Sequence, residues 1–205
     1  MMHPAIAIRE GLALWRGVWC RIWCRVRGVR LEAGRNLRVD GRLIVKGPGR
    51  VILGDNVRIG MTVTPWTYAL DATIEIGSES FVNGTSFGCR QEIRIGPKAI
   101  LGRCSIMDTD FHSIAINRHD PAAAVRVAPV IIEENVWIGA QAGILPGTRI
   151  GANSVVGFGA VCAGNFRENS VIAGNPARVI RSITNRSDQG VTEATDAPPC
   201  PQRSN

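Results

Sequence analysis

The sequence has few of the residues that usually mark nucleic-acid or metal sites. Only 5% of its 205 residues are aromatic, with a single tyrosine, so platforms on which bases could stack are scarce. Its three histidines and six cysteines show no CxxC pair and no histidines at metal-ligand spacing. We therefore expect no metal site, and we expect free thiols in a reducing cytoplasm.

Long apolar runs and a secretory leader are also missing. No continuous apolar segment approaches the roughly 20 residues of a membrane-spanning helix. Residues 1–11 lack the pattern of a signal peptide. The sequence thus predicts a cytoplasmic protein that is not integral to a membrane.

Basic residues are concentrated near the N-terminus. Residues 1–50 contain 11 Lys and Arg against 3 Asp and Glu, whereas the remainder contains 13 against 14. The net charge of +7 therefore belongs to the N-terminal segment. Because binding along phosphates requires basic side chains across the folded surface, we do not expect the rest of the chain to bind nucleic acid.

What the sequence does contain is a six-residue repeat. From Ile95 onward every sixth residue is apolar, with one interruption, and glycine or an acidic residue usually follows it. These apolar positions are Ile95, Leu101, Met107, Ile132, Ile138, Ile144, Ile150 and Val156. The pattern extends N-terminally with slips, through Leu53, Ile59, Leu70, Ile76 and Val82. Helices have period 3.6 and strands period 2, so a recurrence of six is typical of a solenoid.

Each hexad predicts one short strand and one turn, with its aliphatic side chain pointing into a narrow core. A single hexad cannot bury that side chain. Stacked coils can, because each aliphatic side chain lies on the equivalent one above and below, and parallel ladders pair the backbone amides.

Two segments, residues 128–140 (APVIIEENVWIGA) and 173–181 (AGNPARVIR), resemble the hexapeptide-repeat acyltransferases. The resemblance is to sugar O-acetyltransferases of the galactoside, maltose and polysaccharide-biosynthesis type, and covers about residues 50–181. It implies an all-β fold, a left-handed parallel β-helix with a protruding loop and a short N-terminal helix. The handedness comes from the resemblance alone, since the general rule for parallel crossovers favours the right-handed form.

Three regions are expected along the chain. Residues 1–49 form a basic, tryptophan-rich segment that leads into the solenoid, and residues 50–181 form the acyltransferase domain. Residues 182–205 are polar and without hydrophobic periodicity, which predicts a disordered tail.

The interruption of the repeat predicts a surface loop over residues 112–129, with His112 at its start. A neutral imidazole can remove a proton from a hydroxyl or amine as the nucleophile attacks a thioester, so His112 is the candidate general base. Asp108 or Asp110 could orient the imidazole. Turn formation is the alternative for both aspartates, and a capping or exposed position is the alternative for the histidine.

The resemblance also implies binding residues. Asn83 matches a substrate-contacting asparagine, with a corner position in the coil as the alternative, and Arg126 could contact an anionic acceptor. In the family, coenzyme A lies between subunits of a homotrimer, along the late coils and the exit of the solenoid. The matching positions are Trp137, Gly139, Ala140, Gly157, Ala160, Arg178 and Arg181. Many relatives have a phosphate-contacting lysine where this chain has Gly164, which leaves the exit arginines for that contact.

The segment over residues 12–30 combines tryptophan with arginine. Leu12, Trp15, Trp19, Ile22 and Trp23 fall on one stripe of a helix, and most arginines fall outside it. Such a helix could cap the open first coil, pack against other subunits, or lie on an anionic membrane surface.

Together these features predict an enzyme that moves an acetyl group from acetyl-coenzyme A directly to a sugar hydroxyl, in surface-polysaccharide or lipid-linked glycan biosynthesis. The alternatives are an N-acetyltransferase acting on an amino sugar and a non-catalytic β-helix scaffold. A zinc enzyme on the same kind of solenoid would need three histidine ligands, which His112, His119 and the distant His3 do not supply.

Overall fold

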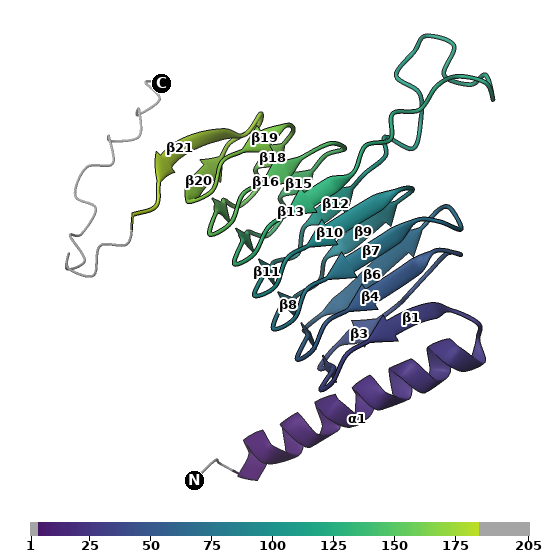
Figure 1. Cartoon of the computed structure of the whole chain (residues 1–205), viewed down its shortest axis with the longest axis vertical. Coiled ribbons are helices and arrows are strands. Elements are labelled where there is room, and N and C mark those ends of the chain that lie inside the picture. The colour runs from purple at the N-terminus through teal and green to yellow at the C-terminus, as the bar shows by residue number, and fades with distance from the viewer. Residues whose placement is uncertain (1–3, 185–205) are drawn as a thin grey trace, which may run out of the picture.

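A computed structural model describes residues 4–184, which form a β-solenoid preceded by one helix (Figure 1). The chain visits three parallel sheets in turn, so three strands complete one coil, and the first sheet contains seven strands. The expected all-β parallel β-helix with an N-terminal helix and a protruding loop is confirmed.

We refer to the three sheets as the first, second and third faces of the solenoid. The first face contains β1 (Arg30–Ala33), β4 (Arg50–Leu53), β7 (Thr73–Ile76), β10 (Glu92–Ile95), β13 (Val130–Ile132), β16 (Arg149–Ile150) and β19 (Asn165–Phe166). The second contains β2 (Arg38–Val39), β5 (Arg58–Ile59), β8 (Phe81–Val82), β11 (Ile100–Leu101), β14 (Trp137–Ile138), β17 (Val155–Val156), β20 (Ser170–Ala173) and the antiparallel β21 (Arg178–Ser182). The third contains β3 (Arg42–Leu43), β6 (Thr62–Thr67), β9 (Ser86–Cys89), β12 (Ser105–Met107), β15 (Gly143–Ile144) and β18 (Val161–Cys162).

The core is a set of stacked aliphatic columns, as the hexads predict. On the first face, Leu53, Ile76, Ile95, Ile132 and Ile150 pair in register from coil to coil, and all five are buried. Burial of each such side chain contributes about 1.5–3 kcal/mol relative to exposure. The aliphatic residues of the repeat therefore form the hydrophobic core.

Two repeat positions were predicted incorrectly. Ile106, not Met107, points into the core of the fourth coil, because the spacing from Leu101 there is one residue shorter than a hexad. Leu70 is 67% exposed on a turn, and Ala72 occupies the buried position instead. The first slip lies where the chain turns from the second face to the third, and the second lies where it turns from the third face back to the first.

The solenoid begins at Arg30, earlier than the boundary expected at residue 50. Leu37 and Val39 are already buried in the first coil. Arg38 lies between these two residues, and Arg42 begins the next strand of the coil. These outward-facing arginines make the hexad pattern difficult to recognise in the sequence. At the other end, β21 closes the second face and reaches Ser182, and the expected disordered tail lies largely outside the described residues.

The corner between the first and second faces is built by residues with positive φ. One such residue occurs in each coil, namely Asn36, Asn56, Glu79, Lys98, Asn135, Asn153 and Asn169. Asparagine tolerates this conformation better than most residues. The Nδ2 groups of Asn135 and Asn153 donate to the amide oxygens of Asn153 and Asn169, at 2.9 and 3.0 Å. This ladder ties neighbouring coils together.

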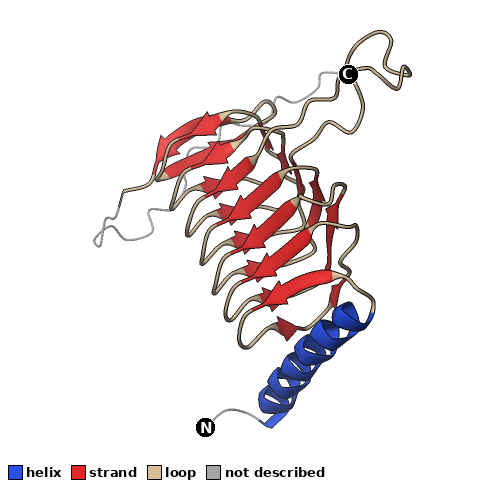
Figure 2. Ribbon diagram, turned by 45° about the vertical axis from the view of Figure 1, so that its right-hand side comes forward, coloured by secondary structure: helices blue, strands red, loops and turns tan. Residues whose placement is uncertain are grey.

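The helix α1 (Pro4–Val26) is longer than the short helix expected over residues 12–30, and it lies against the first coil (Figure 2). Gly28 ends it with φ of 68°, and the amide of Val29 donates to the carbonyl of Cys24 at 2.9 Å. This left-handed glycine cap is a common helix ending. The position of α1 confirms that the N-terminal segment covers the open first coil.

Candidate active site

The loop between β12 and β13 projects from the corner where the third face turns to the first, which we call the third corner (Figure 1). Its two ends are held together by backbone hydrogen bonds. The amide of Asp110 donates to the carbonyl of Arg126 at 3.1 Å, and the amide of Ala128 donates to the carbonyl of Asp108 at 2.8 Å. This stem brings Arg126 beside the start of the loop, although the two segments are far apart in the sequence.

His112 lies just beyond the stem, and its side chain is exposed. Its backbone amide donates to the carbonyl of Asp110 at 2.7 Å. Within residues 4–184, the imidazole has no hydrogen-bond partner. A free, exposed imidazole at the base of a loop is available to accept a proton from a bound molecule.

Asp108 is fully buried and serves the backbone. Its carboxylate accepts three backbone hydrogen bonds, from the amides of Arg90, Gln91 and Glu92, at 2.7, 2.7 and 2.8 Å, and a fourth from the Cys89 thiol at 3.4 Å. Both carboxylate oxygens are occupied in this way. The structure therefore gives Asp108 a structural role in the turn after β9, in place of the expected orientation of the imidazole.

Three other nucleophilic side chains are poorly suited to form an acyl-enzyme. Burial raises the pKa of the Cys104 thiol to about 11, so this side chain is a neutral thiol near pH 7. Burial raises the pKa of Cys89 as well, and the neighbouring carboxylate of Asp108 adds to that effect. Ser113 is also buried, and its hydroxyl accepts from the amide of Ala115 at 3.2 Å.

An aromatic cluster lies next to His112 and was not expected from the sequence. Phe111 has φ of 60°, and its ring packs edge-on against Tyr68 with centroids 4.9 Å apart. Tyr68 in turn stacks on Trp66 at 5.0 Å, and the Lys46 ammonium lies 4.8 Å from the centre of the Trp66 ring. The spacing of two residues between Trp66 on β6 and Tyr68 just after it is the signal that could have indicated this cluster, since residues two apart on an extended chain share a face.

A second group of candidate residues lies where the second face turns to the third, which we call the second corner. Trp137 on β14 is 52% exposed and points outward from the second face. The side-chain oxygen of Asn83 accepts from the amide of Met61 at 3.0 Å, so this residue does occupy a corner position in the coil. Gly139 and Ala140 follow directly on β14.

Backbone amides at the second corner differ in their availability. Those of Gly139 and Gly157 donate to the carbonyls of Val156 and Ile172, both at 2.8 Å, so neither amide is free to bind an oxyanion. The amide of Ala140 has no partner among the described residues. Ala160 is fully buried, so its side chain points into the core and not toward an outer groove, as the expected cofactor contact would require.

The exit of the solenoid carries exposed arginines. Arg178 and Arg181 lie on β21, and Arg167 donates to the hydroxyl of Ser182 at 3.2 Å. Gly164 has φ of 104°, a conformation in which a lysine would be strained. The glycine is therefore required by the turn, and the exposed cations near the end of the chain are arginines.

Part of the six-residue repeat also matches a family of known proteins. Residues 129–164 match the family model "Bacterial transferase hexapeptide (six repeats)". The chain therefore contains hexapeptide repeats. Among the described residues, no group of three or more His, Cys, Asp or Glu side chains could hold a metal ion.

This hexapeptide-repeat protein is similar to two curated bacterial proteins. It is 38% identical over 97 residues to the galactoside O-acetyltransferase of Lactococcus lactis, which covers 47% of this chain and 46% of that protein. It is 27% identical over 169 residues to WbbJ of Escherichia coli, named as a lipopolysaccharide biosynthesis O-acetyl transferase, covering 78% and 72%. The chain thus spans less than half of the galactoside enzyme that it matches.

Among solved structures, the hexapeptide-repeat protein has the fold of the acetyltransferase VCA0836 from Vibrio cholerae. That structure covers 90% of this chain and 96% of its own length, at 20% identity with a TM-score of 0.56. The same enzyme in complex with acetyl-coenzyme A matches at 24% identity and a TM-score of 0.50, covering 73% of this chain and 72% of that one. At this identity the likeness shows the fold.

The hexapeptide-repeat protein does not bring its two groups of candidate residues together in one chain. His112, Asp110 and Arg126 lie at the third corner, whereas Asn83, Trp137 and Ala140 lie on the second face or at the second corner. One face of the solenoid separates the two corners. A site that uses both groups therefore requires two copies of the chain.

Proposed function

We propose that this protein is an O-acetyltransferase that transfers an acetyl group from acetyl-coenzyme A to a hydroxyl of a sugar. The observation that carries the proposal is the free, exposed imidazole of His112 at the base of the loop, on a hexapeptide solenoid. The activities named for the Lactococcus lactis and Escherichia coli relatives support the reaction and the carbohydrate acceptor.

In the proposed reaction, His112 removes the proton of the acceptor hydroxyl while its oxygen attacks the thioester carbonyl. A carbon–oxygen bond forms, and the carbonyl oxygen becomes an oxyanion. The carbon–sulfur bond then breaks, and the departing thiolate of coenzyme A takes the proton from the imidazolium. Direct transfer is favoured because Cys104 and Ser113 are buried, and burial raises the pKa of the Cys104 thiol.

The amide of Ala140 is the donor that we assign to the oxyanion, because it is unpaired among the described residues while the neighbouring Gly139 amide is engaged. The exposed indole of Trp137 precedes it by three residues and would pack against the pantetheine chain. Gly139 and Gly157 lie beside this amide on neighbouring coils, and Gly139 allows their close stacking, since a Cβ there would stand 2.9 Å from the backbone nitrogen of Phe158. Arg178 and Arg181 would bind the phosphates of coenzyme A.

The complete site in this proposal forms between subunits of a homotrimer. The separation of His112 from Trp137 and Ala140 on one chain supports this assembly, since the loop of one copy would reach the second face of the next. Asp110 would orient the imidazole, and Asn83 and Arg126 would contact the acceptor. Because Asn83 uses only its oxygen in the coil, its Nδ2 group remains able to donate to a sugar hydroxyl.

We place the reaction in the cytoplasm, on a surface polysaccharide or a lipid-linked glycan precursor. The name of WbbJ, a lipopolysaccharide biosynthesis O-acetyl transferase, supports this acceptor class. An amine of an amino sugar is the second candidate acceptor. In its favour, an N-acyltransferase from Bacillus cereus crystallised with dTDP and coenzyme A has the same fold, with a TM-score of 0.53 at 19% identity.

The experiment that tests the proposal is release of free thiol from acetyl-coenzyme A over a panel of sugars, nucleotide sugars and amino sugars. Thiol release with a hydroxyl acceptor, lost in His112→Ala, is expected. Thiol release with amino sugars alone would indicate that the protein is an N-acetyltransferase and not an O-acetyltransferase. An absence of both coenzyme A binding and thiol release would leave the protein as a scaffold and overturn the proposal.

A further inference from the structure

The helix α1 has two apolar faces, and only one of them packs on the solenoid. The packed face consists of small residues, with Ala13 and Cys24 buried against the first coil. A Cβ added at Gly17 would stand 2.0 Å from the carbonyl oxygen of Leu37, so the helix approaches the coil too closely for any side chain there. This face is fully occupied by the fold.

Ion pairs fix the helix in this orientation. Glu10 accepts from Arg58 at 2.8 Å and from Arg38 at 3.1 Å. On the solenoid, Asp40 accepts from Arg58 at 2.7 Å and from Arg9 of the helix at 3.3 Å. Because these pairs connect the helix to two coils, α1 is held with its opposite face directed away from the protein.

That opposite face is apolar and uncovered. Trp15, Trp19 and Trp23 are 63%, 54% and 51% exposed, and their rings stack in a row with centroids 6.2 and 6.4 Å apart. Further large apolar side chains at helical spacing lie exposed beside them, namely Ile8, Leu12, Val18, Ile22 and Val26. A continuous strip of this size on a folded protein indicates an interaction surface.

Arginines border the strip on both sides. With 100° of rotation per residue, Arg16 and Arg27 fall along one edge, and Arg21 and Arg25 fall along the other. The Arg27 guanidinium lies 5.8 Å from the centre of the Trp23 ring. Long basic side chains beside an apolar strip can reach the headgroup region while the strip enters the lipid.

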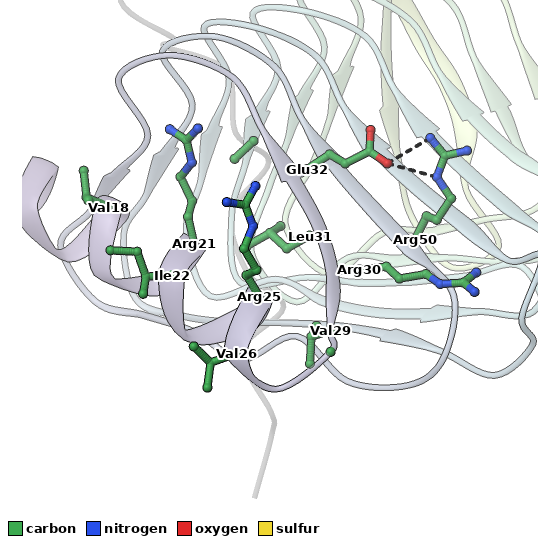
Figure 3. A pocket seen from close by; sticks show the side chains of 12 residues that line it. Val18, Arg21, Ile22, Arg25, Val26, Val29, Arg30, Leu31, Glu32 and Arg50 are labelled. Atoms are coloured by element: carbon green, nitrogen blue, oxygen red, sulfur yellow. Dashed lines mark hydrogen bonds and ion pairs between the residues drawn. The ribbon is translucent and has the colours of Figure 1, made fainter.

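A groove of about 1000 Å³ runs between α1 and the first coil, beside the Arg21 and Arg25 edge (Figure 3). Figure 3 shows Arg21, Arg25, Arg30 and Arg50 around it, with Glu32 paired to Arg50 at 3.1 Å. The lining thus carries a net positive charge. It lies at the opposite end of the solenoid from β21, and it is suited to phosphate groups that approach from the membrane side.

We infer that α1 docks this protein on a bilayer surface that carries anionic phospholipids, with the helix axis parallel to the membrane plane. No helix within residues 4–184 has the length and apolarity needed to cross a bilayer. A second copy of the chain is a poorer occupant, because Glu10 is the only acidic residue of α1 and is already paired. Two such strips would bring arginines against arginines. Anionic headgroups supply the opposite charge.

The test is co-sedimentation of the full chain with vesicles of phosphatidylglycerol and phosphatidylcholine, compared with vesicles of phosphatidylcholine alone. We expect binding to the anionic vesicles and a blue shift of tryptophan fluorescence. The double variant Trp19→Ser/Trp23→Ser should weaken binding at least tenfold. Arg21→Gln and Arg25→Gln should each weaken it by roughly fivefold, the equivalent of about 1 kcal/mol per basic residue.

Ile180→Ser is the matched control, because it also removes a large exposed apolar side chain, but one on β21, at the opposite end of the solenoid from α1. Its vesicle binding should equal that of the unchanged chain, and circular dichroism should show that every variant is folded. Equal binding by the double tryptophan variant would overturn the inference. An absence of binding to anionic vesicles would also overturn it. In either case, a smaller assembly of the double tryptophan variant in light scattering would assign the strip to a contact between subunits.

Discussion

The ring of Phe111 lies directly over Gly88, so that a Cβ added at Gly88 would stand 2.5 Å from its Cζ atom. Gly88 pairs with Trp66 and Met107 on the neighbouring coils of the third face. The glycine thus provides the seat for the aromatic residue that immediately precedes His112. Because Phe111 also has φ of 60°, this seat and the edge contact with Tyr68 hold it in a conformation that is unusual for an aromatic residue.

Gly88→Ala should therefore displace Phe111 and lower the rate of acetyl transfer while leaving the solenoid folded. A displacement of about 1 Å near the reacting groups can cost about 100-fold in rate. The matched control is Gly143→Ala on β15 of the same face, where an added Cβ meets only Val161 methyl groups at 3.9 and 4.0 Å. Measured values of kcat that are equal for the two variants would show that the seat does not position His112.

His112→Ala should lower kcat by roughly 10²–10⁴, the usual contribution of a general base. The dissociation constant for coenzyme A should change little, because the proposed donor contacts lie on the second face and at the exit of the solenoid. Arg178→Ala should show the reverse pattern, with weaker coenzyme A binding. His119→Ala, which changes another exposed histidine of the same loop, is the control and should retain full activity.

Asp108→Asn should lower the free energy of unfolding by about 2 kcal/mol or more. The amide has one oxygen where the carboxylate has two, and buried donors left without a partner cost about 1–3 kcal/mol each. Here three backbone amides depend on that carboxylate. Denaturant unfolding should show little change for Asp110→Asn, whose side chain is only partly buried. Similar stabilities for the two variants would contradict the structural role of Asp108.

Packing of α1 against the first coil of the solenoid should weaken in acid. Burial opposes ionisation of Asp40, but the hydrogen bonds and charges of Arg58 and Arg9 outweigh it and hold the pKa of this carboxyl below its usual value. A depressed pKa stabilises the folded state above the unfolded value of about 3.9, and that contribution is lost as the pH falls through the folded pKa.

The stability advantage of the unchanged chain over Asp40→Asn should accordingly be full near pH 7 and shrink below about pH 4. Thermal unfolding followed through the helix tryptophans measures this difference directly. A difference that stays constant from pH 7 to pH 3 would show that ionised Asp40 does not hold the helix.

Much of the solenoid could be predicted because its information is local and repeated. Ile132, Ile138, Ile144 and Ile150 are spaced by six residues, and each is buried where the hexads place it. The register failed at Met107 and Leu70, where one turn is shorter or longer than the repeat, because a sequence period does not show how many residues a turn contains. The five cysteines of the described residues are free thiols, as expected, and Cys200 lies outside them.

The candidate site was predicted less completely. His112 lies at the base of the loop as expected, but the buried Asp108 and Ala160 show that neighbours in sequence need not share a surface. The contact between Phe111 and Gly88, and the aromatic cluster around it, were not predicted. Trp66, Gly88 and Phe111 come from three different coils, and no short motif connects them.

The sequence by itself determined the coil, its apolar columns, the position of the loop and the amphipathic character of the N-terminal segment, since each depends on residues within one or two repeats. Only the tertiary structure decided which corner of the coil each polar residue occupies and which face of α1 remains uncovered. The physical reason is that winding places residues about 20 positions apart in direct contact, while it separates residues six apart onto different faces. A period of six specifies that a residue points inward, but the number of residues in each turn decides what it meets.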